Sequence, residues 1–245
     1  MRSWALGAMV MVGVAAPARA TVLFDAKGFE APYYSTGKLA GQDGWYADRV
    51  TANTAMVQTA VASSGAQAVR VGSDVTNNRF FPKIDYVPGM GEVISIECDI
   101  ARTTGGMSPS FGYLIDVYVL DGQRVARAGL GRDGNTVRAV RTLVTGTAPA
   151  NPIVYAPMQW VHFEMQLNFA NHTWALLIDG VPTGTGLAMT SVFSPGMSHA
   201  DVQVATFNTS ADEGYFDNYR VRTIPAPGAV ALVAIGVMVA ARRKR

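Results

Sequence analysis

Hydrophobic and polar residues alternate along much of the chain between residues 21 and 223. In residues 93–100, the even-numbered positions from 94 onward are Ile or Cys, whereas positions 95, 97 and 99 are Ser, Glu and Asp. Residues 161–168 alternate in the same way. Because successive side chains of a β-strand point to opposite faces, this period of two predicts strands with one buried and one solvated face.

Turn residues separate these alternating segments into about ten to twelve short strands. Residues 161–168 and 173–180 flank a polar turn at 170–172, which predicts a β-hairpin. Further strands are predicted at 55–61, 66–71, 111–120, 124–130, 137–144, 202–207 and 215–221. No segment between residues 21 and 223 has a helical period. We therefore predict one all-β domain over residues 21–223, a two-sheet antiparallel jelly-roll sandwich.

Charged residues make up only 16% of the 245-residue chain, and they are unevenly placed. Of the 20 Lys and Arg residues, six lie within residues 1–20 and 225–245, where there is no acidic residue, which leaves 14 against 18 Asp and Glu in between. The basic ends indicate membrane topology, and the acidic middle argues against nucleic-acid binding. A single cysteine, Cys98, excludes an internal disulfide and is predicted to be a small buried residue.

Residues 1–20 have the parts of a secretory signal peptide. Arg2 is followed by an apolar stretch, Trp4–Ala16, that is too short for a comfortable membrane span. Ala18 and Ala20 then form an Ala-x-Ala cleavage site for signal peptidase. We predict export and cleavage after Ala20, with an uncleaved membrane anchor as the alternative.

Residues 224–245 form a second targeting segment. Pro225, Ala226 and Pro227 precede an uncharged apolar run, which is followed by four basic residues. This tail resembles the PEP-CTERM sorting signal of Gram-negative bacteria, in which Pro-Glu-Pro precedes a short hydrophobic helix and a basic end; here Ala226 replaces the Glu. The resemblance implies processing by an exosortase-like enzyme and a place in the envelope, on the outer surface or in the extracellular matrix. A simple C-terminal membrane anchor with a cytoplasmic basic end is the alternative.

Motifs at both ends of the middle region, together with one hairpin, carry a second resemblance. They are Phe24-Asp25, Phe29-Glu30, the Gly-Gln-Asp-Gly-Trp segment at 41–45, the segment 215–221 and the hairpin Trp160–Gly180. These segments resemble the concanavalin A-like lectin/glucanase superfamily and its laminin-G-like members. The resemblance implies a jelly roll whose first and last strands are neighbours in one sheet, and it supports a lectin-like function by analogy only.

Glucanases of that superfamily carry a Glu-x-Asp-x-x-Glu strand whose outer acids serve as nucleophile and general acid. Glu97 and Asp99 match the first two acids, but Arg102 stands at the third position. Without that acid the leaving group has no proton donor, so we predict a non-catalytic protein with Glu97 and Asp99 on the solvated face of a strand. His162 and Glu164 share one strand face, but two ligands are too few for a metal site.

Sandwiches of this kind can bind calcium between their first and last strands through carboxylates and carbonyl groups. Asp25, Glu30 and Asp217 would lie there if the terminal strands pair. The alternative is that Asp217 and Asn218 cap a strand or hold the ends of the domain together by hydrogen bonds. Structural calcium is therefore an open possibility for a cofactor.

Carbohydrate binding needs exposed aromatic rings with polar groups nearby. Trp45, Tyr46, Tyr33 and Tyr34 lie in a glycine-rich, loop-like region and are the candidates, with core packing as the alternative for Trp45. We therefore expect an exported surface or matrix protein whose non-catalytic, lectin-like domain binds carbohydrate or exopolysaccharide. Its other partners would be signal peptidase, an exosortase-like enzyme, and the membrane through the tail.

Two other functions stay open. One is a degenerate or divergent glycoside hydrolase or lyase of the same fold, which two carboxylates about 5–5.5 Å apart on one sheet would favour. The other is a purely structural envelope protein, whose exposed faces would lack an aromatic cleft.

Overall fold

The computed structural model describes residues 20–48, 55–72, 79–89, 91–103, 112–133, 136–143, 146–190, 194–204 and 213–225. These residues form sixteen β-strands and one short 3-10 helix, η1 (Lys27–Phe29). The strands are β1 (Val22–Asp25), β2 (Gly37–Lys38), β3 (Trp45–Ala47), β4 (Ala55–Gln58), β5 (Ala68–Gly72), β6 (Arg79–Pro82), β7 (Glu92–Arg102), β8 (Tyr113–Val119), β9 (Arg124–Asp133), β10 (Thr136–Leu143), β11 (Gly146–Tyr155), β12 (Val161–Asn168), β13 (Thr173–Ile178), β14 (Val181–Ala188), β15 (Met197–Val204) and β16 (Glu213–Pro225).

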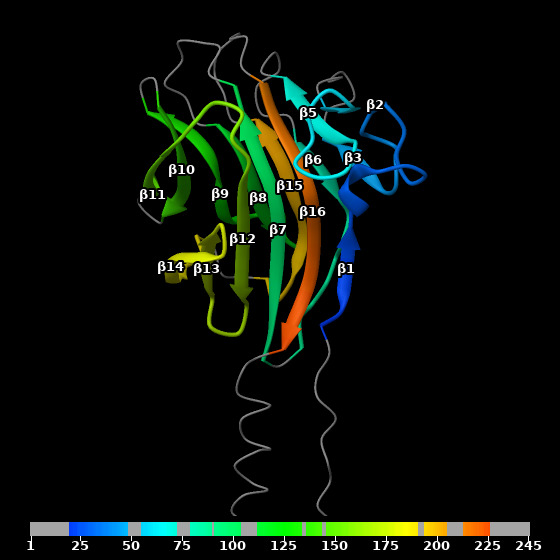
Figure 1. Ribbon diagram of the computed structural model, residues 1–245. Helices are drawn as coiled ribbons and strands as arrows, with labels where there is room; N and C mark the ends of the chain where they lie inside the picture. Colours follow the sequence, from blue (N-terminus) through cyan, green and yellow to red (C-terminus); the bar gives the residue numbers. More distant parts are fainter. Residues whose placement is uncertain are drawn as a thin grey trace, which may run out of the picture.

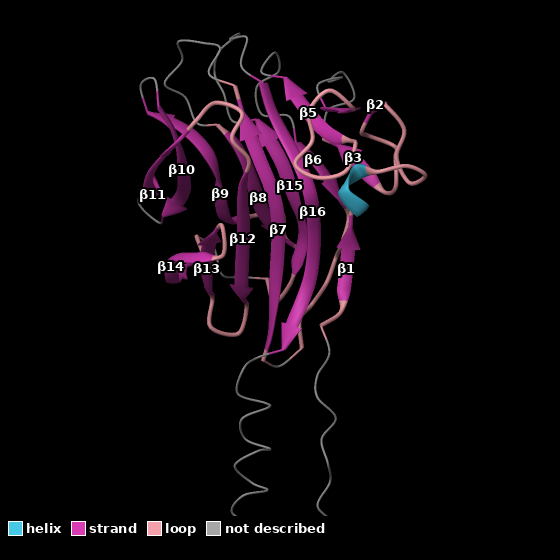
Figure 2. Cartoon of the chain, viewed as in Figure 1, coloured by secondary structure: helices cyan, strands magenta, loops and turns pink. Residues whose placement is uncertain are grey.

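Two antiparallel sheets contain all of these strands. The nine-stranded sheet has the order β14-β13-β12-β7-β16-β5-β4-β2, with β1 also paired to β16, and the seven-stranded sheet has the order β11-β10-β9-β8-β15-β6-β3. Figure 1 shows β12, β7 and β16 in the nearer layer, with β8, β9 and β15 behind them. Strands dominate the described chain, and η1 is its one helical element (Figure 2). The protein is therefore an all-β jelly-roll sandwich, as predicted.

One hydrophobic core fills the space between the sheets. Buried and half-buried residues alternate along the whole of β12, so that Phe163 and Met165 pack into the core while His162 and Glu164 lie on the opposite face. Cys98 is buried in the same core, as predicted. Burying each large apolar side chain contributes about 1.5–3 kcal/mol, which lets the sandwich form without a disulfide.

The first and last strands are neighbours, as the second resemblance implies. Phe24 of β1 lies opposite Val221 of β16. Just before β1, the carbonyl oxygen of Thr21 accepts a hydrogen bond from the backbone N–H of Thr223 (2.8 Å). Asn218 has a positive φ of 51° at the point where the register of β16 against β7 shifts. This β-bulge uses a residue type that tolerates the left-handed conformation.

Strands with strict alternation lie where the sequence predicts them. β12 has the predicted bounds, and β7 extends the predicted segment at both ends. The pattern misses β1, β2, β3 and β6, which are two to four residues long. It also misses β11 and β14, whose glycines and prolines interrupt the alternation.

The two predicted targeting segments fall almost entirely outside the described residues. Of residues 1–20 the structure describes Ala20, and of residues 224–245 it describes Ile224 and Pro225, so Ala18, Ala226 and Pro227 lie outside it. Within the described ranges, no helix is both long enough and apolar enough to cross a membrane.

Candidate functional site

The outward face of the nine-stranded sheet borders an open cleft of about 520 Å³, which we call the polar cleft. Residues from β1, β7, β12 and β16, from the segment around η1 and from the loop before β5 meet there, although they lie far apart in the sequence. The cleft is lined by Asp25, Lys27, Gly28, Glu30, Ser64, Glu97, Asp99, His162, Asn218 and Arg220.

Strand alternation and register decide which side chains meet on this face. Glu97 and Asp99 occupy the outward positions of β7, between residues of the hydrophobic core. Asp99 lies opposite His162 of β12, and Glu97 lies opposite Arg220 of β16. Neighbouring strands are about 4.8 Å apart, so side chains at paired outward positions are within reach of one another.

His162 and Asp99 form an ion pair in the cleft, with Nδ1 of the histidine 2.6 Å from Oδ1 of the aspartate. Ser63 Oγ and the side-chain amide of Asn218 each donate a hydrogen bond of 2.7 Å to the other carboxylate oxygen. Burial raises the pKa of Asp99, but the hydrogen bonds from these three side chains outweigh it, and the pKa is lowered. The hydrogen bond to Asp99 raises the pKa of His162. Asp99 therefore fixes the orientation of the imidazole ring and favours its charged form.

The polar pattern continues along the same three strands. Oε1 of Glu97 accepts a hydrogen bond of 2.7 Å from Nε of Arg222, and Nη2 of the same guanidinium forms an ion pair with it at 2.6 Å. Glu164 accepts hydrogen bonds from Ser95 Oγ and Gln166 Nε2, each at 2.9 Å. Fixed donors and acceptors thus alternate along this strip of the sheet, an arrangement that can bind hydroxyl groups.

Asp25 and Glu30, two of the candidate calcium ligands, also line the cleft, together with Gly28. Asp25 accepts a hydrogen bond from the backbone N–H of Lys27 (2.8 Å) and forms ion pairs with Lys27 and Arg220, at 3.3 and 3.4 Å. Burial tends to raise the pKa of Asp25, but the contacts with Lys27 and Arg220 lower it. Oε1 of Glu30 accepts hydrogen bonds from two backbone N–H groups of the loop before β5, at 2.6 and 2.9 Å.

Asp217, the third candidate calcium ligand, holds the loop that borders the cleft. It accepts hydrogen bonds from the backbone N–H groups of Ser63 (2.9 Å), Ser64 (3.1 Å) and Asn218 (2.7 Å). Burial raises the pKa of Asp217 to about 6, with a contribution from the negative charge of Asp99 that opposes the lowering effect of the three N–H groups.

The three acids therefore lie near one another around β1, η1 and β16, but their oxygens bind the chain itself. In the part of the protein that the structure describes, no three His, Cys, Asp or Glu side chains are placed to hold a metal ion. This donor set does not fit a calcium site and matches the hydrogen-bonding alternative.

The four candidate aromatic residues divide into two buried and two exposed rings. Trp45 and Tyr34 are buried, and the indole N–H of Trp45 donates a hydrogen bond of 3.0 Å to the Tyr34 hydroxyl group. Trp45 also packs against Phe24, Phe29 and Tyr219. A ring packed on several sides cannot stack on a sugar, so Trp45 is a core residue. Tyr33 and Tyr46 stay on the surface, with 57% and 54% of their area exposed.

The third position of the glucanase-like motif lies away from the polar cleft. The pairing of β7 with β12 and β16 shows no bulge on β7, so residue 102 faces the opposite side of the strand from residues 97 and 99. Arg102 is buried, and its guanidinium lies 5.4 Å from the ring centroid of Tyr113. An acid at this position would therefore not complete a pair with Glu97.

Sequence analysis misses Lys27, Ser64, Asn218 and Arg220 as residues of this site. Alternation with the apolar residue Val221 does place Arg220 on an outward face, and this signal could have found it. No local pattern distinguishes the other three, because η1, the loop before β5 and the β16 bulge bring Lys27, Ser64 and Asn218 to the cleft.

No protein-family model matches this chain, and neither does any curated protein. Solved structures do share its fold. A carbohydrate esterase from the Shiga toxin-encoding bacteriophage phi24B is 11% identical with a TM-score of 0.57, covering 84% of this chain and 100% of that one. An alginate lyase bound to an alginate trisaccharide is 12% identical with a TM-score of 0.51, covering 78% of this chain and 95% of that one.

A sialidase is also similar in structure, at 14% identity and a TM-score of 0.50. The match covers 73% of this chain, and the chain spans only 17% of the sialidase. At these identities the likeness establishes the jelly-roll fold. The activities of the three proteins do not transfer with it, because one fold hosts many functions.

Proposed function

We propose that this protein is an exported, non-catalytic carbohydrate-binding protein of the cell surface or extracellular matrix, and that it binds saccharide in the polar cleft. The observation that carries the proposal is an open cleft of about 520 Å³ lined almost entirely by hydrogen-bonding side chains. Saccharide hydroxyl groups both donate and accept hydrogen bonds, so a wall of alternating donors and acceptors suits them. The fold shared with carbohydrate-active proteins supports a carbohydrate-related role.

The charges of the cleft favour a saccharide without acidic groups. Asp25, Glu30, Glu97 and Asp99 line it, against Lys27, Arg220 and the titratable His162. Carboxylates can accept hydrogen bonds from hydroxyl or amine groups, but they repel a carboxylate or sulfate on the ligand. The expected ligand is therefore a neutral or amine-bearing saccharide.

A glycan array probed with the full chain, followed by titration with a selected oligosaccharide, tests this proposal. His162→Asn removes the imidazole that Asp99 orients, whereas His172→Asn makes the same change in the β12–β13 turn, outside the cleft. We expect His162→Asn to weaken binding about tenfold, as the loss of one charge-assisted contact would, and His172→Asn to leave it unchanged. If the folded wild-type chain bound no glycan, the proposal would fail and a purely structural role would remain.

Export rests on the predicted leader and tail. In the sandwich, Thr21 and Thr223 are hydrogen-bonded neighbours, so the two ends of the domain lie together. Cell fractionation with mass spectrometry of the mature protein should find it in the envelope or the medium, with an N-terminus at Thr21. Recovery of the intact chain in the cytosol would contradict export. Loss of residues from 226 onward in an exosortase-dependent manner would support the PEP-CTERM assignment.

A second candidate function, that of a glycoside hydrolase or polysaccharide lyase, is favoured by one pair of carboxyl groups. Asp116 of β8 and Asp201 of β15 lie opposite each other on the seven-stranded sheet. Both are fully buried, and Asp116 is bonded to the guanidinium groups of Arg124 and Arg127, which is why binding is preferred to catalysis. New reducing or unsaturated ends in polysaccharide incubated with the wild-type chain, and their absence with Asp201→Asn, would establish the catalytic alternative.

A further inference from the structure

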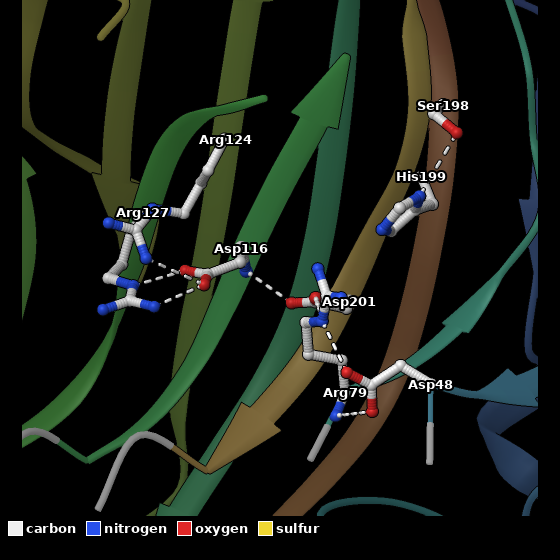
Figure 3. Close-up of polar contacts among 8 residues, drawn as sticks. All are labelled: Asp48, Arg79, Asp116, Arg124, Arg127, Ser198, His199 and Asp201. Carbon is white, nitrogen blue, oxygen red and sulfur yellow. Dashed lines mark hydrogen bonds and ion pairs between the residues drawn. The ribbon is translucent and has the colours of Figure 1, made fainter. Parts of the chain in front are cut away.

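The outward face of the seven-stranded sheet holds a second polar cluster, separate from the polar cleft (Figure 3). Its side chains come from β6, β8, β9 and β15 and from the residue after β3. Three arginines and three aspartates lie on this face, which we call the arginine face, together with one tyrosine and one histidine. It is defined by Asp48, Arg79, Asp116, Tyr118, Arg124, Arg127, His199 and Asp201.

Asp116 fixes two arginines of β9 on this face. Both carboxylate oxygens of Asp116 accept hydrogen bonds from the guanidinium of Arg127, in a bidentate pair. Arg124 Nη1 lies 3.4 Å from the same carboxylate. The Arg127 side chain is 10% exposed, whereas that of Arg124 is 36% exposed. Arg124 therefore keeps hydrogen-bond donors that a ligand can reach, because a guanidinium group has five N–H donors.

Arg79 approaches the same area from β6. Its Nε donates a hydrogen bond of 2.9 Å to Asp48, and its guanidinium carbon lies 4.9 Å from the ring centroid of Tyr118. Arg124 occupies the position paired with Tyr118 on β9. The guanidinium of Arg79 thus lies over the Tyr118 ring, Arg124 starts from the paired position on β9, and the Arg79 side chain is 32% exposed.

Buried polar atoms without a hydrogen-bond partner lie beside these arginines. Asp201 is fully buried, and its Oδ2 has no hydrogen bond among the described residues, although Arg79 Nε lies 4.0 Å away. Gln203, two residues further along β15 and also buried, leaves Oε1 without a partner. Buried polar atoms are nearly always paired, so two such acceptors on one strand face indicate a ligand or ordered water.

His199 adds a third acceptor on β15. Ser198 Oγ donates its hydrogen to Asp85 (3.0 Å), so it can only accept from the neighbouring His199 Nδ1, at 3.2 Å. In a neutral imidazole the other nitrogen is then an acceptor, and this Nε2 is buried without a hydrogen bond in the described structure. The ring is stacked between Phe81 and Tyr118, at 4.2 and 4.9 Å between centroids, which prevents it from turning away.

We propose that the arginine face is a second binding site, and that its ligand is a carboxylated saccharide of the uronic-acid type. The ligand carboxylate would accept hydrogen bonds from the free donors of Arg79 and Arg124. Its hydroxyl groups would donate to His199 Nε2 and would form a hydrogen bond with Asp201 Oδ2, which can donate when this carboxyl group is protonated. A ligand that lacks either the carboxylate or the hydroxyl groups would leave one of these two sets of protein atoms unpaired.

The electrostatics of the face agree with an acidic ligand. Burial, with the charge of Asp116 as a second cause, raises the pKa of Asp201 well above its usual value, which favours the uncharged form of this carboxyl group. Burial and the charge of Arg79 lower the pKa of His199 to about 4, so the imidazole is neutral. Besides Asp201, three arginines face the carboxyl groups of Asp48 and Asp116, so this face carries more basic than acidic groups, the opposite of the polar cleft.

The two sheets are stacked with their inward faces in the core, so the arginine face and the polar cleft lie on opposite sides of the domain. If the proposed function of the cleft holds as well, the protein would connect an acidic polysaccharide to a non-acidic one. The arginine face does not depend on the cleft, and it can be tested by itself.

Titration calorimetry of the full chain with alginate oligosaccharides tests this inference, with dextran sulfate and dextran oligosaccharides as the sulfated and neutral arms. Arg124→Gln removes one guanidinium from the arginine face, and Arg70→Gln is the matched control, because Arg70 is a 45%-exposed arginine paired with Glu213 on the other sheet. We expect the wild-type chain to bind alginate. Arg124→Gln should weaken this binding about tenfold, as the loss of one charge-assisted contact would. Arg70→Gln should leave it unchanged.

A second variant, His199→Phe, preserves the stacked rings and removes the Nε2 acceptor. It should also weaken alginate binding, without the change in salt dependence that Arg124→Gln causes. Thermal unfolding of each variant separates loss of binding from loss of fold. Absence of alginate binding by the folded wild-type chain, equal affinity for dextran sulfate, or an equal effect of Arg124→Gln and Arg70→Gln would overturn the inference. If His162→Asn, and not Arg124→Gln, abolished alginate binding, the acidic ligand would lie in the polar cleft.

Discussion

The hydroxyl group of Tyr219 donates a hydrogen bond of 2.7 Å to the backbone carbonyl of Ala200, and this bond joins the two sheets through the core. Tyr219 belongs to β16 of the nine-stranded sheet, and Ala200 belongs to β15 of the seven-stranded sheet. Both residues are fully buried. A polar contact inside the core fixes the position of one sheet over the other, because either partner alone would be a buried group without a hydrogen bond.

Tyr219→Phe should therefore lower the free energy of unfolding by about 1–3 kcal/mol, the usual cost of leaving a buried acceptor unpaired. Equilibrium unfolding in urea measures this. Tyr33→Phe is the matched control, since Tyr33 is exposed and should change stability by less than about 0.5 kcal/mol. Equal effects of the two substitutions would show that the inter-sheet bond contributes nothing.

Trp45 and Tyr46 are adjacent in the sequence but have opposite environments, 1% and 54% exposed. Trp45→Ala should reduce the free energy of unfolding by about 3–5 kcal/mol, because it leaves a cavity among packed rings. Tyr46→Ala should change it by no more than about 0.5 kcal/mol. Thermal and urea unfolding of both variants check this, and a stable Trp45→Ala variant would return Trp45 to the ligand-binding candidates.

The raised pKa of Asp217 predicts a pH dependence of stability. Because its folded-state pKa is about 6, against an ordinary value of 3.8, the folded protein binds this proton more tightly than the unfolded chain. The resulting stabilisation is fully present below about pH 3.8 and is lost as the pH rises through about 6. The free energy of unfolding, measured from pH 3.5 to 7.5, should show this pH dependence in the wild-type chain and lack it in Asp217→Asn. The same pH dependence in both proteins would contradict the prediction.

The contribution of His199 to the pH dependence of stability should have the opposite sign. Its folded-state pKa of about 4 lies below the ordinary value of 6.5, so the unfolded chain binds this proton more tightly. The corresponding stability is present above about pH 6.5 and is lost as the pH falls towards about 4. His199→Phe keeps the stacked rings and should remove this component from the unfolding curve. An unchanged pH profile would show that the imidazole is not held neutral in the folded protein.

Gly214 of β16 makes a close approach to the ring of Tyr113 that only glycine allows. A Cβ atom at this position would lie 2.0 Å from the ring. Gly214→Ala should therefore destabilise the fold by about 1–3 kcal/mol, the usual cost of overpacking a core. Gly122→Ala is a useful comparison, because a Cβ there has no neighbour within 4 Å and only its positive φ opposes the change. A larger loss from Gly122→Ala than from Gly214→Ala in thermal unfolding would contradict this reading of the packing.

Sequence analysis predicts the fold better than it predicts the site. Alternation in β7 and β12 is a local property, and it correctly assigns Glu97, Asp99 and His162 to outward faces. The aromatic candidates show its limit. Trp45 and Tyr46 both occur in a glycine-rich segment, and only their position on a three-residue strand against β6 decides that one ring is buried and the other exposed.

By itself, the sequence determined that this chain forms strands and which residues of each long strand point away from the core, because both follow from a period of two between neighbouring residues. Only the tertiary structure decided that His162 meets Asp99 and that Asp116 meets Asp201. Those pairs lie 63 and 85 residues apart in the chain. Their meeting depends on strand order and register, and a shift of one residue would turn each side chain to the other face of its sheet.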